Sequence, residues 1–193
     1  MRILMLGNSF TSANDLPSML AERTGAEVVA HTRGGARLAE QLNPKTRMGA
    51  RTLKALETEA WDYVVLQEMS NGPVTARDKF RKSVCGLCEK IRAAGAIPVL
   101  YATWAYQDGG KKLAAFGMSY ADMYQQMHAA CHEAAEQNHM RIADVGKAFY
   151  EQSAGKNLYA EDGCHPNEDG SRLAAEILTE TILEGYEYGL FEK

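Results

Sequence analysis

The chain has 193 residues, of which 46% are hydrophobic and 24% are charged. This balance is typical of a globular protein with a core of its own, and it excludes a disordered tail, a collagen-like fibre and a small disulfide-stapled fold. The formal net charge is −4 and no basic cluster exceeds residues 79–82, so the charge pattern of a nucleic-acid-binding protein is missing. We expect a single domain over residues 1–193 and no nucleic-acid partner.

The first residues form an apolar run that ends at Gly7, which is too short for a signal peptide. No window approaches the ~18 consecutive apolar residues that span a membrane. We therefore expect a cytoplasmic protein without a membrane partner. In that compartment cysteines are reduced thiols, and the four in this chain are Cys85, Cys88, Cys131 and Cys164.

Short β-type runs alternate with longer helical patterns along the chain. The five expected strands cover residues 2–6, 27–32, 61–67, 96–103 and 141–145, and Pro98 is unusual inside the fourth. Helical spacing of apolar residues begins at Leu16 and ends at Gly25, and it returns in 77–94, 120–134 and 173–182. The Gly- and Lys-rich stretch 106–117 is expected to be a surface loop or lid.

Strands that alternate with helices indicate a parallel sheet with helices on both faces. Five strands in 193 residues predict an α/β fold of the flavodoxin-like type, a three-layer sandwich around a five-stranded parallel sheet. Ligands of such open sheets bind outside the carboxyl ends of the strands. The residues that follow each expected strand are therefore the candidates for chemistry.

Polar residues and glycines stand at those positions. Ser9 follows the first strand, Gly34 and Gly35 follow the second, and Asp162 and His165 lie beyond the fifth. A serine can act as nucleophile, a histidine as its base and an aspartate as the group that orients the base. Ser9 alone could be a helix N-cap, and the aspartate–histidine segment alone could be a turn. Their joint occurrence favours hydrolysis by acyl transfer.

The tetrapeptide Gly-Asn-Ser-Phe at 7–10, a glycine after the second strand, an amide after the third and Asp-x-x-His at 162–165 resemble the SGNH (GDSL-type) hydrolases. The resemblance extends from residue 3 to about residue 175. It implies that Ser9 is the nucleophile, His165 the base and Asp162 the partner of the base. It also implies an oxyanion hole formed by the N–H groups of Ser9 and Gly35 and a third donor after strand three.

The chain departs from the family pattern in two places, which resemble a bacterial branch of the superfamily. Gly-Asn-Ser at 7–9 replaces the usual Gly-Asp-Ser, and Leu-Gln-Glu-Met-Ser-Asn at 66–71 replaces the usual Gly-x-Asn-Asp block. The third donor is then either Gln67 or Asn71, and we favour Gln67 because Met69 replaces the glycine of the turn before Asn71. Gly34 is an alternative to Gly35. Glu68 is either an acid behind the site or, as we favour, a solvated strand end.

The resemblance implies a serine esterase that needs no cofactor and no metal. Met69, Trp104, Tyr106 and Phe116 follow the third and fourth strands and are expected to line the substrate pocket. Aromatic walls suit the face of a sugar, so the expected partner is a small-molecule ester such as an O-acetylated carbohydrate. The alternatives are a binding module without turnover in the same cleft, and a lipase- or thioesterase-type hydrolase of the same fold.

Three other motifs are expected to have ordinary structural roles. Cys85 and Cys88 lie in mid-helix and not at the helix N-terminus that a redox pair needs, so buried thiols are expected. His128 and His132 have the i,i+4 spacing of helix-borne zinc ligands, but no glutamate follows His128 and no third ligand is obvious from the sequence, so a solvated face is expected. Ser119 does not follow a strand, which argues against a nucleophile elbow there.

Overall fold

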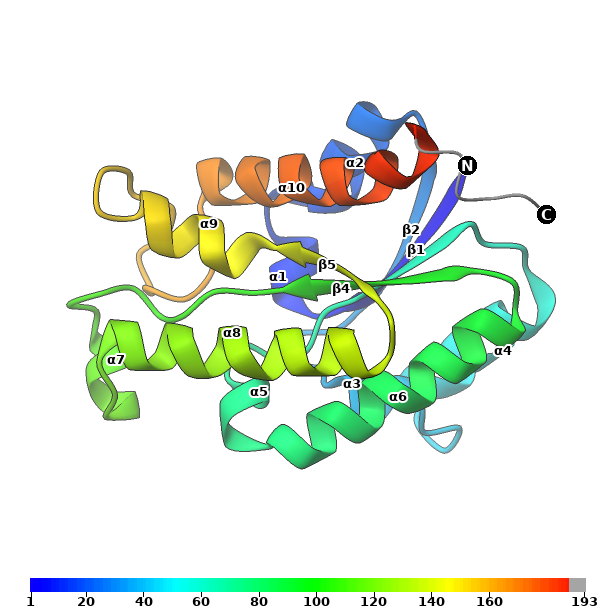
Figure 1. Ribbon diagram of the computed structural model, residues 1–193, viewed down its shortest axis with the longest axis horizontal. Coiled ribbons are helices and arrows are strands. Elements are labelled where there is room, and N and C mark those ends of the chain that lie inside the picture. Colours follow the sequence, from blue (N-terminus) through cyan, green and yellow to red (C-terminus); the bar gives the residue numbers. More distant parts are fainter. Residues whose placement is uncertain (188–193) are drawn as a thin grey trace.

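The computed structural model describes residues 1–187 and contains a five-stranded sheet (Figure 1). The strands are β1 (Arg2–Gly7), β2 (Glu27–Thr32), β3 (Tyr63–Leu66), β4 (Ile97–Ala102) and β5 (Arg141–Asp144). Neighbouring strands are parallel, in the order β2-β1-β3-β4-β5. In this flavodoxin order the winding reverses between β1 and β3, so the carboxyl ends of these two strands are the expected place for a ligand.

Helices cover both faces of the sheet. On one side lie α2 (Leu16–Thr24), α9 (Val145–Gln152) and α10 (Glu168–Glu187), and on the other lie α4 (Arg47–Thr58), α6 (Arg77–Ala93) and α8 (Tyr120–Gln137) (Figure 1). The shorter helices are α1 (Ser9–Ser12), η1 (Ala13–Asp15), α3 (Leu38–Gln41), α5 (Gly72–Thr75) and α7 (Lys111–Phe116). The predicted α/β three-layer sandwich is thereby confirmed. Within residues 1–187, no helix combines the length and apolar character needed to cross a membrane.

The two helix layers bury opposite faces of the strands. In β1, Ile3 and Met5 join the apolar cluster that includes residues of α2 and α10, whereas Leu4 and Leu6 join the cluster that includes residues of α4 and α6. Successive side chains of a strand point to opposite faces, so a strand covered on both sides must be apolar throughout. This is why the three central strands, β1, β3 and β4, read as nearly continuous apolar runs in the sequence.

Pro98 fits into β4 because of its position relative to the neighbouring strands. The N–H of Ile97 donates to the carbonyl of Asp62 at 2.9 Å, so the following nitrogen, that of Pro98, faces the β5 side. Pairing with β5 begins only at Val99, opposite Arg141. The proline therefore removes no ladder hydrogen bond.

The stretch 106–117 differs from its prediction as a loop. Its second half forms α7, and Gly117 ends that helix with a left-handed φ of 76°. The sequence also does not predict α4 and α9, because their buried apolar positions are few. In α4 the buried residues are Gly49, Thr52, Ala55 and Leu56.

Candidate active site

Ser9 lies directly after β1, at the first position of α1. The turn between strand and helix is tight, because a Cβ atom on Gly7 would lie 2.3 Å from Oγ1 of Thr11 and 2.6 Å from Oε1 of Gln67. The side chain of Asn8 caps α1 by accepting the N–H of Phe10 at 3.0 Å. A residue without a side chain, followed by a helix cap, thus fixes the serine at the carboxyl edge of the sheet.

The structure brings Ser9, His165 and Asp162 together, although 156 residues separate the serine from the histidine. Oγ of Ser9 lies 2.8 Å from Nε2 of His165, and Nδ1 of His165 lies 2.6 Å from Oδ2 of Asp162. A carboxylate beside Nδ1 favours the tautomer that carries its proton there, and Nε2 then presents its lone pair to the serine hydroxyl. This arrangement can remove a proton from Ser9.

Asp162 is held as a carboxylate by the turn that it starts. Desolvation opposes its ionisation, but hydrogen bonds from the His165 ring and from the N–H groups of His165 and Cys164 outweigh that effect, so its pKa is well below the usual value. Both N–H groups donate to Oδ1, at 2.9 and 3.0 Å. Gly163 completes the turn with a left-handed φ of 65°. The aspartate therefore stays charged while it orients His165.

A small cavity of about 190 Å³ opens beside the serine. Its lining residues are Asn8, Ser9, Phe10, Gly35, Met69, Ser70, Lys112, Cys164 and His165. Gly35 belongs to this lining and has a left-handed φ of 67°, whereas Gly34 does not line the cavity. The glycine that the sequence analysis favours is thus the one beside Ser9.

Gln67 occupies a different place from the one predicted. Its side chain is 1% exposed, and Oε1 accepts hydrogen bonds from the N–H of Asn8 at 2.9 Å and from Oγ1 of Thr11 at 3.0 Å. Its amide nitrogen donates to the carbonyl of Glu68. Both ends of the amide are engaged beneath the turn that carries Ser9, so this geometry does not offer Gln67 as an oxyanion donor.

Asn71 and Glu68 also depart from their predictions. Asn71 does not line the cavity; it precedes α5, where its Oδ1 lies 3.4 Å from Oγ1 of Thr75. Glu68 is 6% exposed and is not a solvated strand end. Its carboxylate accepts the N–H groups of Met69 at 2.8 Å and Leu38 at 3.2 Å, and burial raises its pKa. It therefore ties the segment after β3 to the start of α3.

Trp104 supports the site from the core and is not a pocket wall, contrary to the prediction. It is 1% exposed and stacks between Phe10, at a centroid distance of 4.9 Å, and Phe149, at 3.9 Å. Its indole N–H donates to the carbonyl of Cys164 at 3.0 Å. Phe10 in turn sets its ring edge-to-face against His165 at 5.4 Å. The indole therefore packs beneath both the helix that begins with Ser9 and the turn that carries His165.

Of the four residues predicted to line the pocket, Met69 lies in the cavity wall. Tyr106 is 8% exposed and reaches the wall through its hydroxyl, 3.2 Å from Oγ of Ser70. Phe116 lies further out and sets its ring edge-to-face against Tyr106 at 5.7 Å. Tyr106 and Phe116 therefore stand behind the wall, and the aromatic side chain in the wall beside Ser9 is Phe10.

Three residues at the site are not identified by the sequence analysis as functional. The amide nitrogen of Asn8 donates to the carbonyl of Ala36 at 3.0 Å and so holds the Gly35 segment against Ser9. A carboxylate at this position could not donate that hydrogen bond. Ser70 faces the cavity, and Lys112 places Nζ 3.4 Å from Oδ2 of Asp162. The departure of Asn8 from the family pattern is the signal that could have identified it.

Two of the motifs that are expected to be structural, Ser119 and the cysteine pair of α6, have structural roles. Ser119 caps α8 by accepting the N–H of Asp122 at 3.1 Å. Cys85 and Cys88 lie within α6, where Cys88 is buried, but Cys85 is exposed and not buried as expected. Burial raises the pKa of the Cys88 thiol to about 12, which is opposite to what a redox-active cysteine requires.

Comparison with known proteins identifies the family. The sequence profile of the GDSL-like lipase/acylhydrolase family matches residues 5–173. A protein from Slackia heliotrinireducens with a provisional assignment as an SGNH hydrolase is 55% identical, with a TM-score of 0.90 over 94% of this chain and 98% of that one. No curated protein matches the chain significantly.

Two more distant structures share the fold. A DUF4886 family protein from Bacteroides uniformis has a TM-score of 0.73 at 21% identity, over 95% of this chain and 83% of that one. A catalytic mutant of an acetylxylan esterase from Geobacillus stearothermophilus has a TM-score of 0.71 at 15% identity, over 94% of this chain and 93% of that one. The profile match and the Slackia protein confirm the resemblance stated above: the chain belongs to the GDSL-like lipase/acylhydrolase family of SGNH hydrolases.

Proposed function

We propose that this family member is a serine esterase that hydrolyses short-acyl esters, in particular O-acetyl esters of carbohydrates. The observation that carries the proposal is the continuous hydrogen-bonded series Ser9–His165–Asp162, with distances of 2.8 and 2.6 Å. Nucleophile, base and orienting carboxylate within hydrogen-bond reach are the geometric requirement for activating a serine.

In the first half of the reaction, Nε2 of His165 takes the hydroxyl proton as Oγ of Ser9 attacks the ester carbonyl. The tetrahedral intermediate collapses, the C–O bond to the alcohol breaks, and the imidazolium returns its proton to the leaving alkoxide. In the second half, His165 takes a proton from water, which attacks the acyl-enzyme; the bond between the acyl carbon and Oγ of Ser9 breaks, the imidazolium returns its proton to Oγ, and the carboxylic acid is released. Asp162 keeps its charge throughout and stabilises the imidazolium.

The oxyanion that forms in both halves needs preorganised donors. We assign this role to the N–H groups of Ser9 and Gly35, which border the cavity beside the nucleophile. On the third side, where the family carries a side-chain donor, the lining residue with a polar side chain is Ser70, whose Oγ lies 3.2 Å from the hydroxyl of Tyr106. Ser70 therefore replaces Gln67 and Asn71 as our candidate for that donor.

Cavity size and fold support the substrate class. About 190 Å³ beside Ser9 accommodates a short acyl group, and Met69 forms part of its wall. The acetylxylan esterase that shares the fold acts on an acetylated sugar polymer, as its name states. The polar rim of Ser70 and Lys112 suits a hydroxylated alcohol better than a lipid chain.

A p-nitrophenyl acetate assay tests the proposal. We expect turnover by the wild type, and a loss of at least about 10⁴-fold in kcat in Ser9→Ala and His165→Ala, because nucleophile and base act as a unit. Asp162→Ala should retain roughly 10- to 100-fold more activity than either, since only the orientation of the base is lost. An organophosphonate probe should label Ser9 in the wild type. A wild type that binds esters without turnover, or equal mild losses in all three variants, would refute the proposal.

A further inference from the structure

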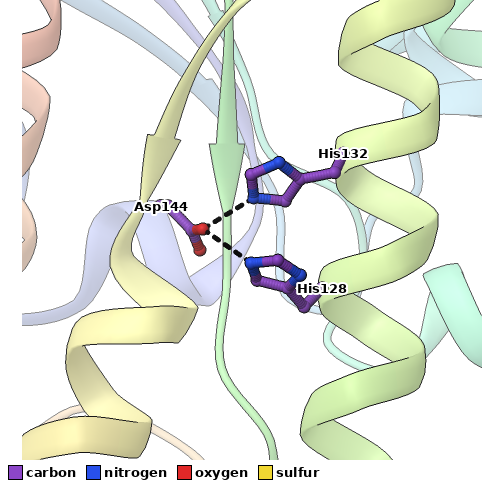
Figure 2. A group of neighbouring side chains, drawn as sticks. All are labelled: His128, His132 and Asp144. Atoms are coloured by element: carbon purple, nitrogen blue, oxygen red, sulfur yellow. Dashed lines mark hydrogen bonds and ion pairs between the residues drawn. The ribbon is translucent and has the colours of Figure 1, made fainter.

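Two histidines of α8 converge on one carboxylate oxygen at the end of β5 (Figure 2). Nε2 of His128 lies 3.2 Å and Nε2 of His132 lies 2.7 Å from Oδ2 of Asp144. The two imidazole rings are stacked, with centroids 4.0 Å apart. From the sequence, a solvated histidine pair is expected; in the structure both rings instead contact Asp144, which belongs to another element.

The three side chains are held in place by the fold. His128 and His132 stand one turn apart on α8, an 18-residue helix, so both rings leave the same face. Asp144 is the last residue of β5 and caps α9, where its Oδ1 accepts the N–H of Lys147 at 3.1 Å. That cap fixes the carboxylate and leaves Oδ2 directed at the histidines.

The atoms have the spacing of a metal site. The ligand atoms of the three residues all lie within 4.8 Å of one another. Ligands about 2.0–2.2 Å from a tetrahedral Zn²⁺ lie about 3.3 Å apart. The separation of 3.2 Å between His128 and Asp144 is already close to this value, and the separation of 2.7 Å between His132 and Asp144 would have to widen by about 0.6 Å. The side chains of His128 and His132 are 34% and 42% exposed, which gives an ion a path from solvent and leaves a coordination position for water.

The donor set selects the class of ion. Two imidazole nitrogens and one carboxylate oxygen suit Zn²⁺ and related transition metals, whereas Mg²⁺ and Ca²⁺ prefer oxygen ligands. The carboxylate also gives the three ligands a negative charge, which is opposite to that of the ion. We propose that His128, His132 and Asp144 bind one Zn²⁺-type ion, which joins α8 to the junction of β5 and α9.

The competing arrangement is a hydrogen-bonded cluster in which both imidazoles donate to Asp144 and no ion binds. The two differ in a measurable way, because a metal site takes up Zn²⁺ with a defined stoichiometry that depends on all three side chains. A hydrogen-bonded cluster predicts no specific zinc affinity.

The test is a titration of the untagged, full-length protein with Zn²⁺ against a chromogenic chelator, together with Co²⁺ as a spectroscopic probe. We expect one ion per chain, a visible d–d absorption of bound Co²⁺, and a Tm that rises with Zn²⁺ until the site is saturated. Loss of an outer-shell partner typically weakens metal binding about 10- to 100-fold. His128→Gln, His132→Gln and Asp144→Asn each remove a direct ligand and should weaken it at least as much.

Two controls locate the ion. His139→Asn removes an exposed histidine just beyond α8 and suits its left-handed φ of 48°, so it should leave zinc affinity unchanged. Asp162, Cys164 and His165 form a second group with metal-ligand spacing, so His165→Gln should abolish esterase activity but keep the one-ion titration. Unchanged binding in His128→Gln, loss of binding in His165→Gln, or no Co²⁺ absorption in the wild type would overturn the proposal. These readouts do not depend on the proposed esterase activity.

Discussion

The side-chain oxygen of Gln67 accepts the backbone N–H of Asn8 at 2.9 Å, directly beneath the turn that carries Ser9. The same oxygen accepts the hydroxyl of Thr11 at 3.0 Å, so one amide fixes both sides of the turn. Because these groups are buried, no water can replace the amide. Gln67 thus positions Ser9 without lining the cavity.

This role predicts a loss of stability on substitution. Gln67→Ala leaves the N–H of Asn8 unpaired in the core, so we expect the free energy of unfolding in urea to fall by about 1–3 kcal/mol, with a lower kcat because Ser9 is less well placed. Asn71→Ala, at a half-buried residue outside the cavity, is the matched control and should change neither quantity much. Full stability combined with a kcat loss of about 10²–10³-fold in Gln67→Ala would restore it as an oxyanion donor.

Gly34 and Gly35 are adjacent, but of the two only Gly35 lines the cavity, so their alanine variants form a matched pair. Gly35 has a φ of 67° and Gly34 has no left-handed φ, while a Cβ atom would meet nothing within 4 Å at either. Alanine should therefore be harmless at 34 but costs about 1–2 kcal/mol of backbone strain at 35. We expect Gly35→Ala to lower kcat by about 10-fold or more as its N–H moves, with little change in KM. Equal kinetics of the two variants would remove Gly35 from the oxyanion hole.

The small cavity predicts a preference among acyl groups. With about 190 Å³ beside Ser9, p-nitrophenyl acetate should be hydrolysed with a kcat/KM about 10-fold or more above that of the octanoate. Met69→Ala should shift the preference toward longer chains because it enlarges the cavity, whereas Met69→Leu keeps the volume and serves as control. A kcat/KM that rises steadily with chain length in the wild type would instead indicate a lipase-like enzyme.

A buried histidine far from the serine should make stability depend on pH. Burial and the nearby charge of Arg51 lower the pKa of His31 from 6.5 to about 4. Its Nδ1 lies 2.9 Å from Oγ1 of Thr52, and that hydroxyl donates to Oε1 of Gln41 at 2.5 Å, so the neutral ring donates to Thr52. His31 binds a second ring proton more readily in the unfolded chain than in the folded protein. The folded state therefore has its full stability above pH 6.5 and loses part of it as the pH falls toward 4.

Urea unfolding at about pH 7 and about pH 4.5 measures this effect. The loss of unfolding free energy between the two should be about 1–2 kcal/mol larger in the wild type than in His31→Gln, whose side chain does not titrate. The comparison within each protein cancels the packing cost of the substitution. Identical pH dependence in the two proteins would show that His31 does not contribute.

The positions of the strands and the meeting of Ser9, Asp162 and His165 are predictable because local patterns encode them. Apolar runs mark β1, β3 and β4 most clearly, and Ser9 and the segment 162–165 carry short motifs. The carboxyl ends of parallel strands share one edge of the sheet, so such motifs meet without knowledge of the loops.

Side-chain direction after a strand is not encoded in the same way. Gln67, Glu68 and Trp104 all follow strands, but whether each turns into the core or toward the cavity depends on neighbours that are distant in sequence. Gln67 meets Asn8, 59 residues away, and Trp104 meets Cys164, 60 residues away. The pairing of His128 and His132 with Asp144 is not predicted either, because it depends on how α8 packs against the end of β5.

The wide separation of Ser9 from His165 has a consequence for biosynthesis. A growing polypeptide carries the proposed nucleophile, Ser9, from the first strand onward but acquires its proposed base, His165, only 156 residues later. The late segment must then dock on the early one, where Asn14 donates to the carbonyl of Pro166 at 3.1 Å and to the hydroxyl of Ser171 at 2.9 Å. Nascent or truncated chains that lack this segment should therefore be inert toward cellular esters, and the appearance of activity should report that synthesis has passed residue 171 and that the last helix has docked.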